Sequence, residues 1–174
     1  MTDTPSLAVT VLGHDRPGII AEVTGALADL GGNLEDSSMT LLRGHFAWTL
    51  IVSGPSLEQV RERLASLAED DLVVTVLVVP EDNAVAAPSD TRYLLSVHGG
   101  DRPGIVSTIT GVVAAAGGNI VDLTTRLSKD LYVVVAEIVL PNTVEIGELE
   151  RELTAAAGAV GVGVTLRPED TDLL

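Results

Sequence analysis

The chain has 174 residues with 46% hydrophobic and 2% aromatic side chains, no cysteine, and a formal net charge of -15 at neutral pH. This length allows one ordinary domain or two small ones, and the apolar content is that of a globular protein. The negative charge and the lack of any Lys/Arg cluster argue against direct binding to nucleic acid, and the lack of cysteine excludes disulfides and thiol chemistry.

The first half of the chain alternates between the periodicity of strands and that of helices. The predicted elements are, in order, a strand at 7–12, a helix at 17–30, strands at 34–42 and 46–53, a helix after Ser56, and a strand at 72–79. Gly31 and Gly32 end the first helix, Ser56 can cap the second, and residues 43–45 form a short hairpin connection.

The second half repeats this order. Its predicted strands lie near 93–97, 120–127, 132–140 and 160–166, and its helices lie near 103–116 and 144–156. Gly13 corresponds to Gly99, an offset of 86 residues that needs no gap from the first strand to the last. The sequence therefore predicts two equal units.

These patterns divide the chain into a domain at 1–80, a linker at 81–91, a second domain at 92–168 and a tail at 169–174. The linker contains Pro, Asp and small residues, which suit an exposed connection. Acidic residues gather at 69–71 and again in the tail, where solvated charge is the simplest interpretation.

Strand, helix, strand, strand, helix, strand is the ferredoxin-like βαββαβ plan of the α+β class. It predicts a four-stranded antiparallel sheet with two helices on one face in each domain. The strands are apolar on both faces, so we expect the helix-free face or an edge to be covered by another unit, within the chain or across a dimer. Gly161 and Gly163 would let another backbone come close; the alternative is a weak terminal strand.

The repeated stretch Asp-Arg-Pro-Gly, at 15–18 and 101–104, predicts an open helix start. Proline has the φ angle that begins a helix, and the glycine after it leaves the first turn uncovered. That turn presents unpaired N–H groups and the positive end of the helix dipole, which suit a carboxylate. Asp15 and Asp101 could accept hydrogen bonds from the same N–H groups or from a ligand ammonium, so the turn matches a free amino acid.

Structural explanations compete with this functional one. Asp15 and Asp101 can simply cap the helices, and Arg16 and Arg102 can face water. His14, which becomes Gly100 in the second copy, can bind an effector, respond to pH, or lie in solvent. The two copies also differ four residues after the glycine of the turn, where Glu22 of the first copy corresponds to Thr108 of the second.

One glycine stands in the middle of the predicted first helix of each unit. Gly25 and Gly111 each cost about 1 kcal/mol relative to alanine at a helix interior. Close packing of the helix against a neighbour explains that cost better than contact with a ligand.

The sequence contains no recognisable motif for metal binding, nucleotide binding or nucleophilic catalysis. The three histidines have no metal-ligand spacing, the glycines at 158–163 are followed by neither a helix start nor a lysine, and no serine has a recognisable paired base. We therefore expect no catalytic residues, no metal and no cofactor. The chain begins without the pattern of a signal peptide, and its apolar runs are too short to span a bilayer, so we expect a cytoplasmic protein that does not bind membranes.

A strand, Asp-Arg-Pro-Gly-Ile, a helix, and Gly-Gly-Asn entering a second strand together resemble the ACT domain, a ligand-binding regulatory module with the βαββαβ plan. The resemblance covers nearly the whole chain, twice. Among tandem ACT proteins, the chain is most similar to transcriptional repressors of glycine cleavage, which share an aromatic early in the third strand, as Phe46 and Tyr132 stand here. Formyltetrahydrofolate deformylases and some phosphoserine phosphatases share the turn, but this chain has no length for their catalytic domains.

The resemblance implies an effector at the interface between units, near the entrance of the second strand. The resemblance also implies that the effector is glycine or a similar small amino acid and that the partner is a transcriptional activator of glycine metabolism. The candidate ligand-binding residues are then His14, Asp15, Arg16, Pro17, Gly18, Asn33, Asp101, Arg102, Pro103, Gly104 and Asn119. Asn33 and Asn119 can also merely finish the helices that precede them.

We therefore expect a non-enzymatic regulatory protein, paired as a homodimer, that binds a small amino acid and controls a partner regulatory protein. An assembly module that binds no small molecule and acts on a metabolic enzyme is the alternative. A catalytic protein with an unrecognised active site is the third possibility.

Overall fold

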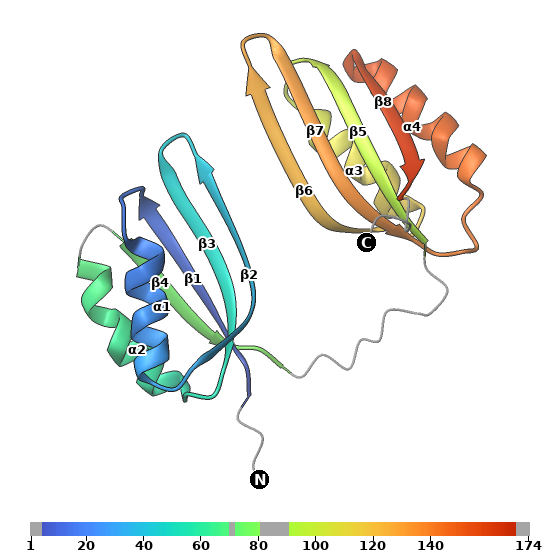
Figure 1. The fold of residues 1–174 in the computed structure, drawn as a ribbon. Helices are drawn as coiled ribbons and strands as arrows, with labels where there is room; N and C mark the ends of the chain where they lie inside the picture. Colours follow the sequence, from blue (N-terminus) through green and yellow to red (C-terminus); the bar gives the residue numbers. More distant parts are fainter. Residues whose placement is uncertain (1–4, 70–71, 81–90, 170–174) are drawn as a thin grey trace. The chain divides into compact units, whose positions relative to one another are not determined.

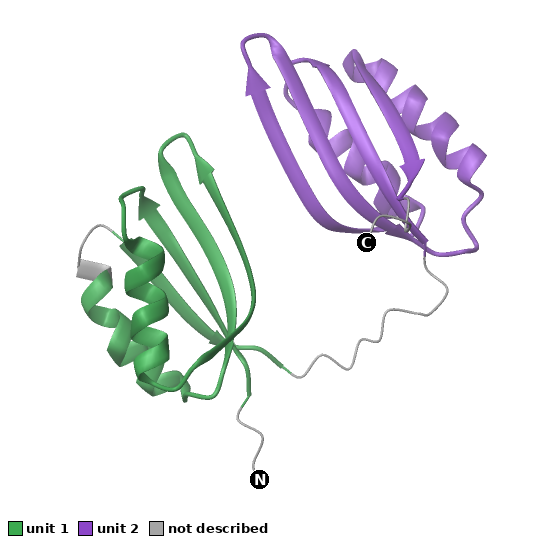
Figure 2. Ribbon diagram, in the orientation of Figure 1, with its two compact units in different colours: residues 1–84 green, residues 85–174 purple. Residues whose placement is uncertain are grey.

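A computed structural model describes residues 5–69, 72–80 and 91–169 of the chain. The chain divides into two compact units, residues 1–84 and 85–174 (Figure 2). The expected linker at 81–91 and tail at 169–174 lie outside the described residues except at their edges: Thr91 is the first residue of a strand, and Glu169 follows the last one.

Unit 1 is a four-stranded antiparallel sheet with two helices on one face (Figure 1). Its elements are β1 (Leu7–His14), α1 (Ile19–Asp29), β2 (Asn33–Leu42), β3 (His45–Ser53), α2 (Leu57–Ala65), a 3-10 turn (Ser66–Glu69) and β4 (Leu72–Val78). The strand order is β2-β3-β1-β4. The predicted βαββαβ plan is confirmed for this unit.

Unit 2 has the same plan (Figure 1). Its elements are β5 (Thr91–Gly100), α3 (Ile105–Ala115), β6 (Asn119–Ser128), β7 (Leu131–Leu140), α4 (Ile146–Val160) and β8 (Val162–Pro168). The strand order β6-β7-β5-β8 matches that of unit 1. Within the described residues, no helix is long and apolar enough to cross a membrane.

Each unit has its own core between the sheet and its helices. In unit 1, Val9 and Val11 of β1 are fully buried, as are Val23 of α1 and Val60 of α2. Leu95 and Val97 of β5 hold the corresponding places in the core of unit 2. Alternate residues of the central strands therefore point into the core, as the sequence periodicity predicts.

The helix ends follow the chemistry of their sequences. The Ser56 side chain accepts a hydrogen bond from the Gln59 N–H at 3.3 Å, and the Gln59 side chain accepts one from the Ser56 N–H at 2.9 Å, which is a capping box. After α1, Gly31 adopts φ +74, and the N–H groups of Gly31 and Gly32 bond back to Ala28 and Leu27. The predicted cap and the predicted double-glycine stop are both confirmed.

The constant offset of 86 residues between the two units does not extend to their last strands. The expectation that the two units align without a gap is therefore wrong. Val9 pairs with Val76 in unit 1, and Leu95 pairs with Leu166 in unit 2. Equivalent positions therefore lie 86 residues apart in β1 and β5 but 90 apart in β4 and β8. The four additional residues lie between β7 and β8, a part of the chain that includes the longer helix α4.

The expected approach of another backbone at Gly161 and Gly163 is also wrong, because side chains of the same unit occupy this space. Gly161 ends α4 with φ +72, and a Cβ added there would lie 2.5 Å from Nη1 of Arg102. A Cβ added at Gly163 would lie 2.8 Å from the imidazole ring of His98 on β5. Both glycines make room for cationic or polar side chains from unit 2 itself.

The helix-free face of unit 1 carries exposed apolar side chains. Leu12 of β1 is 46% exposed, and Val73 and Leu77 of β4 are 63% and 58% exposed. These residues alternate with the buried ones, so they lie on the face without helices. That another unit covers this face stays a prediction.

The glycines inside α1 and α3 have open surroundings, so the expected close packing at these positions is wrong. A Cβ added at Gly25 or at Gly111 would meet nothing within 4 Å outside its own helix backbone. We therefore expect Gly25→Ala and Gly111→Ala each to raise the free energy of unfolding by about 1 kcal/mol, because alanine is the better helix former. Urea unfolding followed by circular dichroism measures this change.

Gly163→Ala is the matched control, since its new methyl group would overlap the ring of His98. It is expected to lower stability, and to lower it less when His98 is also changed to alanine. A loss of stability in Gly25→Ala would contradict the open surroundings of that position.

Candidate functional site

The repeated Asp-Arg-Pro-Gly stretch links the first strand of each unit to its first helix. The helices begin at Ile19 and Ile105, two residues later than the prolines. The expectation that Pro17 and Pro103 are the first helical residues is therefore wrong. Each proline instead precedes a glycine that forms the N-cap of the helix.

Gly18 and Gly104 adopt left-handed backbone conformations, with φ +96 and φ +91. Residues other than glycine rarely adopt this conformation, because their Cβ atom then crowds the following carbonyl oxygen. Glycine is needed at these positions for the chain reversal itself. The bare helix start that the sequence suggests is a consequence of that requirement.

Neither Asp15 nor Asp101 caps its helix, because within the described residues no side chain makes a cap hydrogen bond to α1 or α3. Both aspartates are exposed. The N–H of Asp15 donates to the carbonyl of Gly44 in the β2–β3 turn at 3.1 Å, which fixes the first copy of the turn against that hairpin. The capping interpretation is thus wrong, and the carboxylates stay exposed to solvent.

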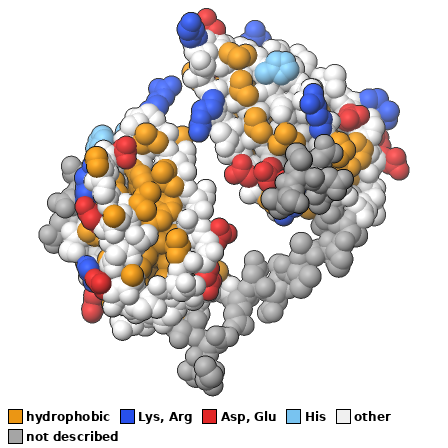
Figure 3. All heavy atoms as spheres, in the orientation of Figure 1, with side chains coloured by type: hydrophobic (Ala, Val, Ile, Leu, Met, Phe, Trp, Pro, Cys, Tyr) orange, Lys and Arg blue, Asp and Glu red, His pale blue; other side chains and the backbone are white. Residues whose placement is uncertain are grey.

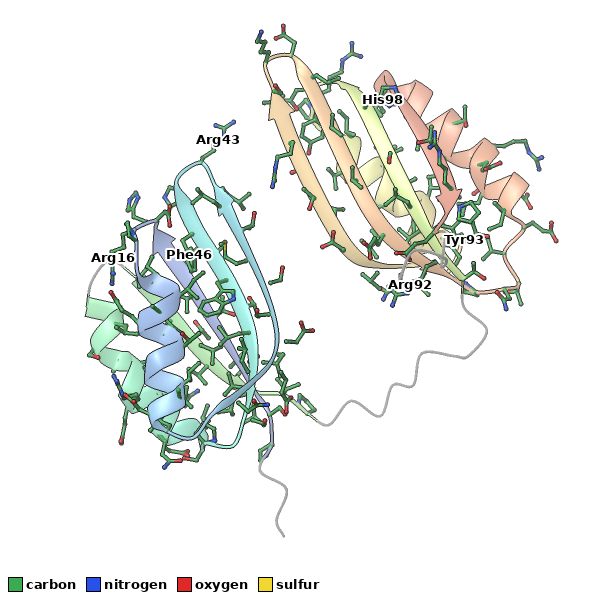
Figure 4. The ribbon with its side chains drawn as sticks, viewed as in Figure 1. Arg16, Arg43, Phe46, Arg92, Tyr93 and His98 are labelled. Atoms are coloured by element: carbon green, nitrogen blue, oxygen red, sulfur yellow. The ribbon has the colours of Figure 1, made fainter. Side chains whose placement is uncertain are left out.

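A groove of about 520 Å³ lies between this turn and the sheet in unit 1. Its lining consists of residues 15–21 on one side and of Met39, Leu41 and Phe46 from β2 and β3 on the other. Figure 3 shows a band of hydrophobic side chains on the visible face of unit 1, and Figure 4 shows Arg16 and Phe46 at the same end of the unit. Apolar walls with a few charged groups at one end are typical of small-molecule sites.

Arg16 makes a two-pronged ion pair with Glu22, one turn into α1. Both pairs of atoms, Nη1 to Oε1 and Nη2 to Oε2, are 2.7 Å apart. The expectation that Arg16 faces water is therefore wrong, although its side chain is still 34% exposed. The hydrogen bonds from Arg16 hold the pKa of Glu22 below its ordinary value of 4.5, against a smaller opposing effect of desolvation.

The second copy of the turn is arranged differently. Thr108 stands where unit 1 has Glu22, so the carboxylate partner is missing. The guanidinium of Arg102 lies over Gly161 at the C-terminal end of α4. A helix C-terminus attracts cations, so this arginine has a place in unit 2 that Arg16 does not have in unit 1.

His14 and His45 form a pair that the sequence analysis missed. They lie opposite each other on β1 and β3, with ring centroids 4.8 Å apart. The pairing depends on strand register, which the separation of the two residues in the sequence does not reveal. Across the described parts of the chain, no three His, Cys, Asp or Glu side chains come together as metal ligands.

Asn33 and Asn119 do not join the turn residues of their own unit. They are the first residues of β2 and β6, just after the C-terminal ends of α1 and α3. Helix α1 has 11 residues, and at about 1.5 Å per residue it separates Asn33 from the turn by roughly 16 Å. Within unit 1, the turn, the ion pair and the groove therefore form one candidate site, and Asn33 lies apart from it.

The sequence analysis also missed the groove-lining role of Met39 and Leu41, which are 49% and 50% exposed. Both lie on the helix side of β2, opposite Trp48 and Phe46, but α1 does not reach over this edge strand. The alternation of apolar residues in β2 beside an uncovered edge is the signal that could have identified them.

Comparisons with known proteins agree with this architecture. ACT domain family models match residues 6–76 and 93–156. The chain is 42% identical over 78 residues to a UPF0237 protein of Methanopyrus kandleri, a match that covers 42% of this chain and 86% of that protein. It is 26% identical over 121 residues to the glycine cleavage system transcriptional repressor of Escherichia coli, covering 69% of this chain and 64% of the repressor.

Among solved structures, the chain is similar to a protein of unknown function from Galdieria sulphuraria. The TM-score is 0.81 at 28% sequence identity, and the match covers 96% of this chain and 99% of that chain. The tandem arrangement is therefore shared along nearly the full length of both proteins.

Replacing Gly18 with alanine tests the left-handed turn. Gly18→Ala is expected to lower the free energy of unfolding by about 1 to 2 kcal/mol, because an L side chain is strained at this φ. Gly100→Ala is the control, since Gly100 has open space and no positive φ. Chemical denaturation measures both variants, and an equal effect of the two would contradict the assigned role of Gly18.

Replacing Arg16 tests the ion pair. In Arg16→Gln, the pKa of Glu22 is expected to return toward 4.5, as followed by carboxyl-carbon NMR during a pH titration. The folded-state pKa is lowered in the wild type, so the ion pair contributes its stability above the unfolded pKa and loses it as pH falls through the folded value. An unchanged Glu22 titration in the variant would show that Arg16 is not the cause.

Proposed function

Because the chain belongs to the ACT domain family and carries two such domains in tandem, we propose that it is a regulatory protein that binds a small amino acid and controls a partner protein. The observation that carries this proposal is the groove of unit 1, which places charged turn residues beside an apolar wall. A free amino acid has two opposite charges at one end and a side chain at the other, and this arrangement offers groups for each.

The roles of the residues follow from their positions. Asp15 is exposed at the groove and accepts hydrogen bonds from the ligand ammonium. Arg16 and the start of α1 face the ligand carboxylate, and Phe46 lies against its carbon atoms. Pro17 and Gly18 shape the turn and keep side chains away from this end. Asp101, Pro103 and Gly104 stand at the corresponding positions in unit 2. Arg102 would have to leave its place over Gly161 to face a ligand carboxylate there.

The similarity to a transcriptional repressor supports a regulatory use of this binding. We propose glycine or a similarly small amino acid as the effector and a transcriptional regulator of glycine metabolism as the partner. The effector would favour one arrangement of the units over another and pass that bias to the partner. In this proposal the protein is a cytoplasmic, non-enzymatic homodimer, and Asn33 and Asn119 contribute where units meet.

A second candidate function is an assembly module that binds no small molecule. The exposed Leu12, Val73 and Leu77 on the helix-free face of unit 1 favour it, because contiguous exposed apolar surface marks sites of protein association. Such a module would use its sheets to bind a metabolic enzyme or a regulator.

A thermal-shift panel of the amino acids distinguishes the two candidates. A ligand present at 100 times its dissociation constant adds about 2.7 kcal/mol to the free energy of unfolding. This gain raises the melting temperature by roughly 5 to 10 °C for domains of this size. The effector model predicts such a shift for at least one small amino acid. A flat response to every amino acid at millimolar concentration would refute the effector model and leave the assembly module standing.

Variants then locate the site. Asp15→Ala and Asp101→Ala are each tested for the shift, and loss of the shift in either one identifies the turn that binds. Asp36→Ala is the matched control, since Asp36 is an exposed aspartate near the opposite end of β2 from the hairpin. A full shift in both turn variants would refute the proposed site.

A further inference from the structure

The arginine that lines the charged end of the unit 1 groove, Arg16, is already paired with a carboxylate of the protein, that of Glu22. Glu22 holds both guanidinium nitrogens of Arg16 at 2.7 Å, in the paired geometry with which an arginine also recognises a free carboxylate. Oε1 of Glu22 also lies 3.3 Å from the position that a Cβ on Gly18 would take. This side chain therefore folds back over the bare start of α1.

The charged residues of the groove lining, together with Glu22, carry a net negative charge. Asp15 and Glu22 are carboxylates, Arg16 is the one cation of the groove lining, and Glu22 already neutralises it. A ligand ammonium is attracted to such a site. A ligand carboxylate is repelled unless Glu22 moves away from Arg16.

We propose that Glu22 is a built-in competitor for the ligand carboxylate at the first copy of the turn. This inference rests on the proposed amino-acid binding and adds its regulation: the ligand must displace Glu22 from Arg16 before its own carboxylate can pair there. The Glu22 side chain is 42% exposed, so it has space to leave without disturbing the core.

The second copy of the turn lacks this competitor. Thr108 replaces Glu22, and a Cβ added at Gly104 would meet nothing within 4 Å, whereas the Cβ at Gly18 would meet the Glu22 carboxylate. One chain thus contains the same turn with and without an internal carboxylate. The competition is a property of Glu22 and not of the Asp-Arg-Pro-Gly stretch.

The test compares Glu22→Gln with Glu62→Gln. Both variants remove one negative charge from an exposed helical glutamate, and Glu62 lies on α2 and is not the partner of Arg16. Wild type and both variants are titrated with glycine, alanine and serine, and with acetate and methylamine, which carry the two charged ends of an amino acid separately. The readout is the dissociation constant from the NMR shifts of the Gly18 and Ile19 amides, at constant ionic strength.

Glu22→Gln is expected to tighten binding of the amino acids and of acetate by about two- to fivefold, the range for loss of one exposed competing ion pair. Methylamine is expected to bind no more tightly, and Glu62→Gln is expected to change nothing. Unchanged or weaker binding of acetate and amino acids to Glu22→Gln would overturn the inference while leaving the proposed function intact. If neither protein binds any amino acid, the proposed function fails, and this inference fails with it.

Discussion

The left-handed backbone of Gly18 and Gly104 is the constraint on which the candidate site depends. At φ +96 and +91 the chain leaves the first strand of its unit and reverses onto the sheet as a helix. This reversal places the start of α1 beside the hairpin-side ends of β2 and β3, where the groove forms. The apolar lining, the exposed aspartate and the ion pair at the groove all take their positions from this one turn.

Most of the fold could be predicted from the sequence, because local patterns and tertiary structure agree. Apolar residues in α1 recur at helical spacing, and the structure buries Ile19, Val23 and Leu27 together. Ser56 and the Gly31–Gly32 pair mark helix ends through hydrogen bonds to residues three to five positions away. Such short-range signals are readable in a single sequence.

The details of the site could not be predicted, because they depend on which side chains meet in space. Arg16 and Arg102 stand in identical stretches, yet one pairs with Glu22 and the other lies over Gly161, at the far end of the second unit's sequence. His14 and His45 meet through strand register, and the groove through an edge strand that its helix does not cover. The four added residues before β8 stayed hidden because a glycine-rich, valine-rich strand can be aligned in more than one register.

The fit between His98 and Gly163 also bears on how a chain with two similar halves keeps its strands apart during folding. Val73 of β4 holds the place in unit 1 that Gly163 holds in unit 2. If β4 were to enter the wrong sheet, beside β5, the valine side chain would fall where even an added Cβ would lie only 2.8 Å from the His98 ring. Tandem repeats are prone to such strand exchange, and this steric clash makes the exchanged pairing unfavourable. The glycine in β8 thus disfavours the entry of β4 into the sheet of unit 2.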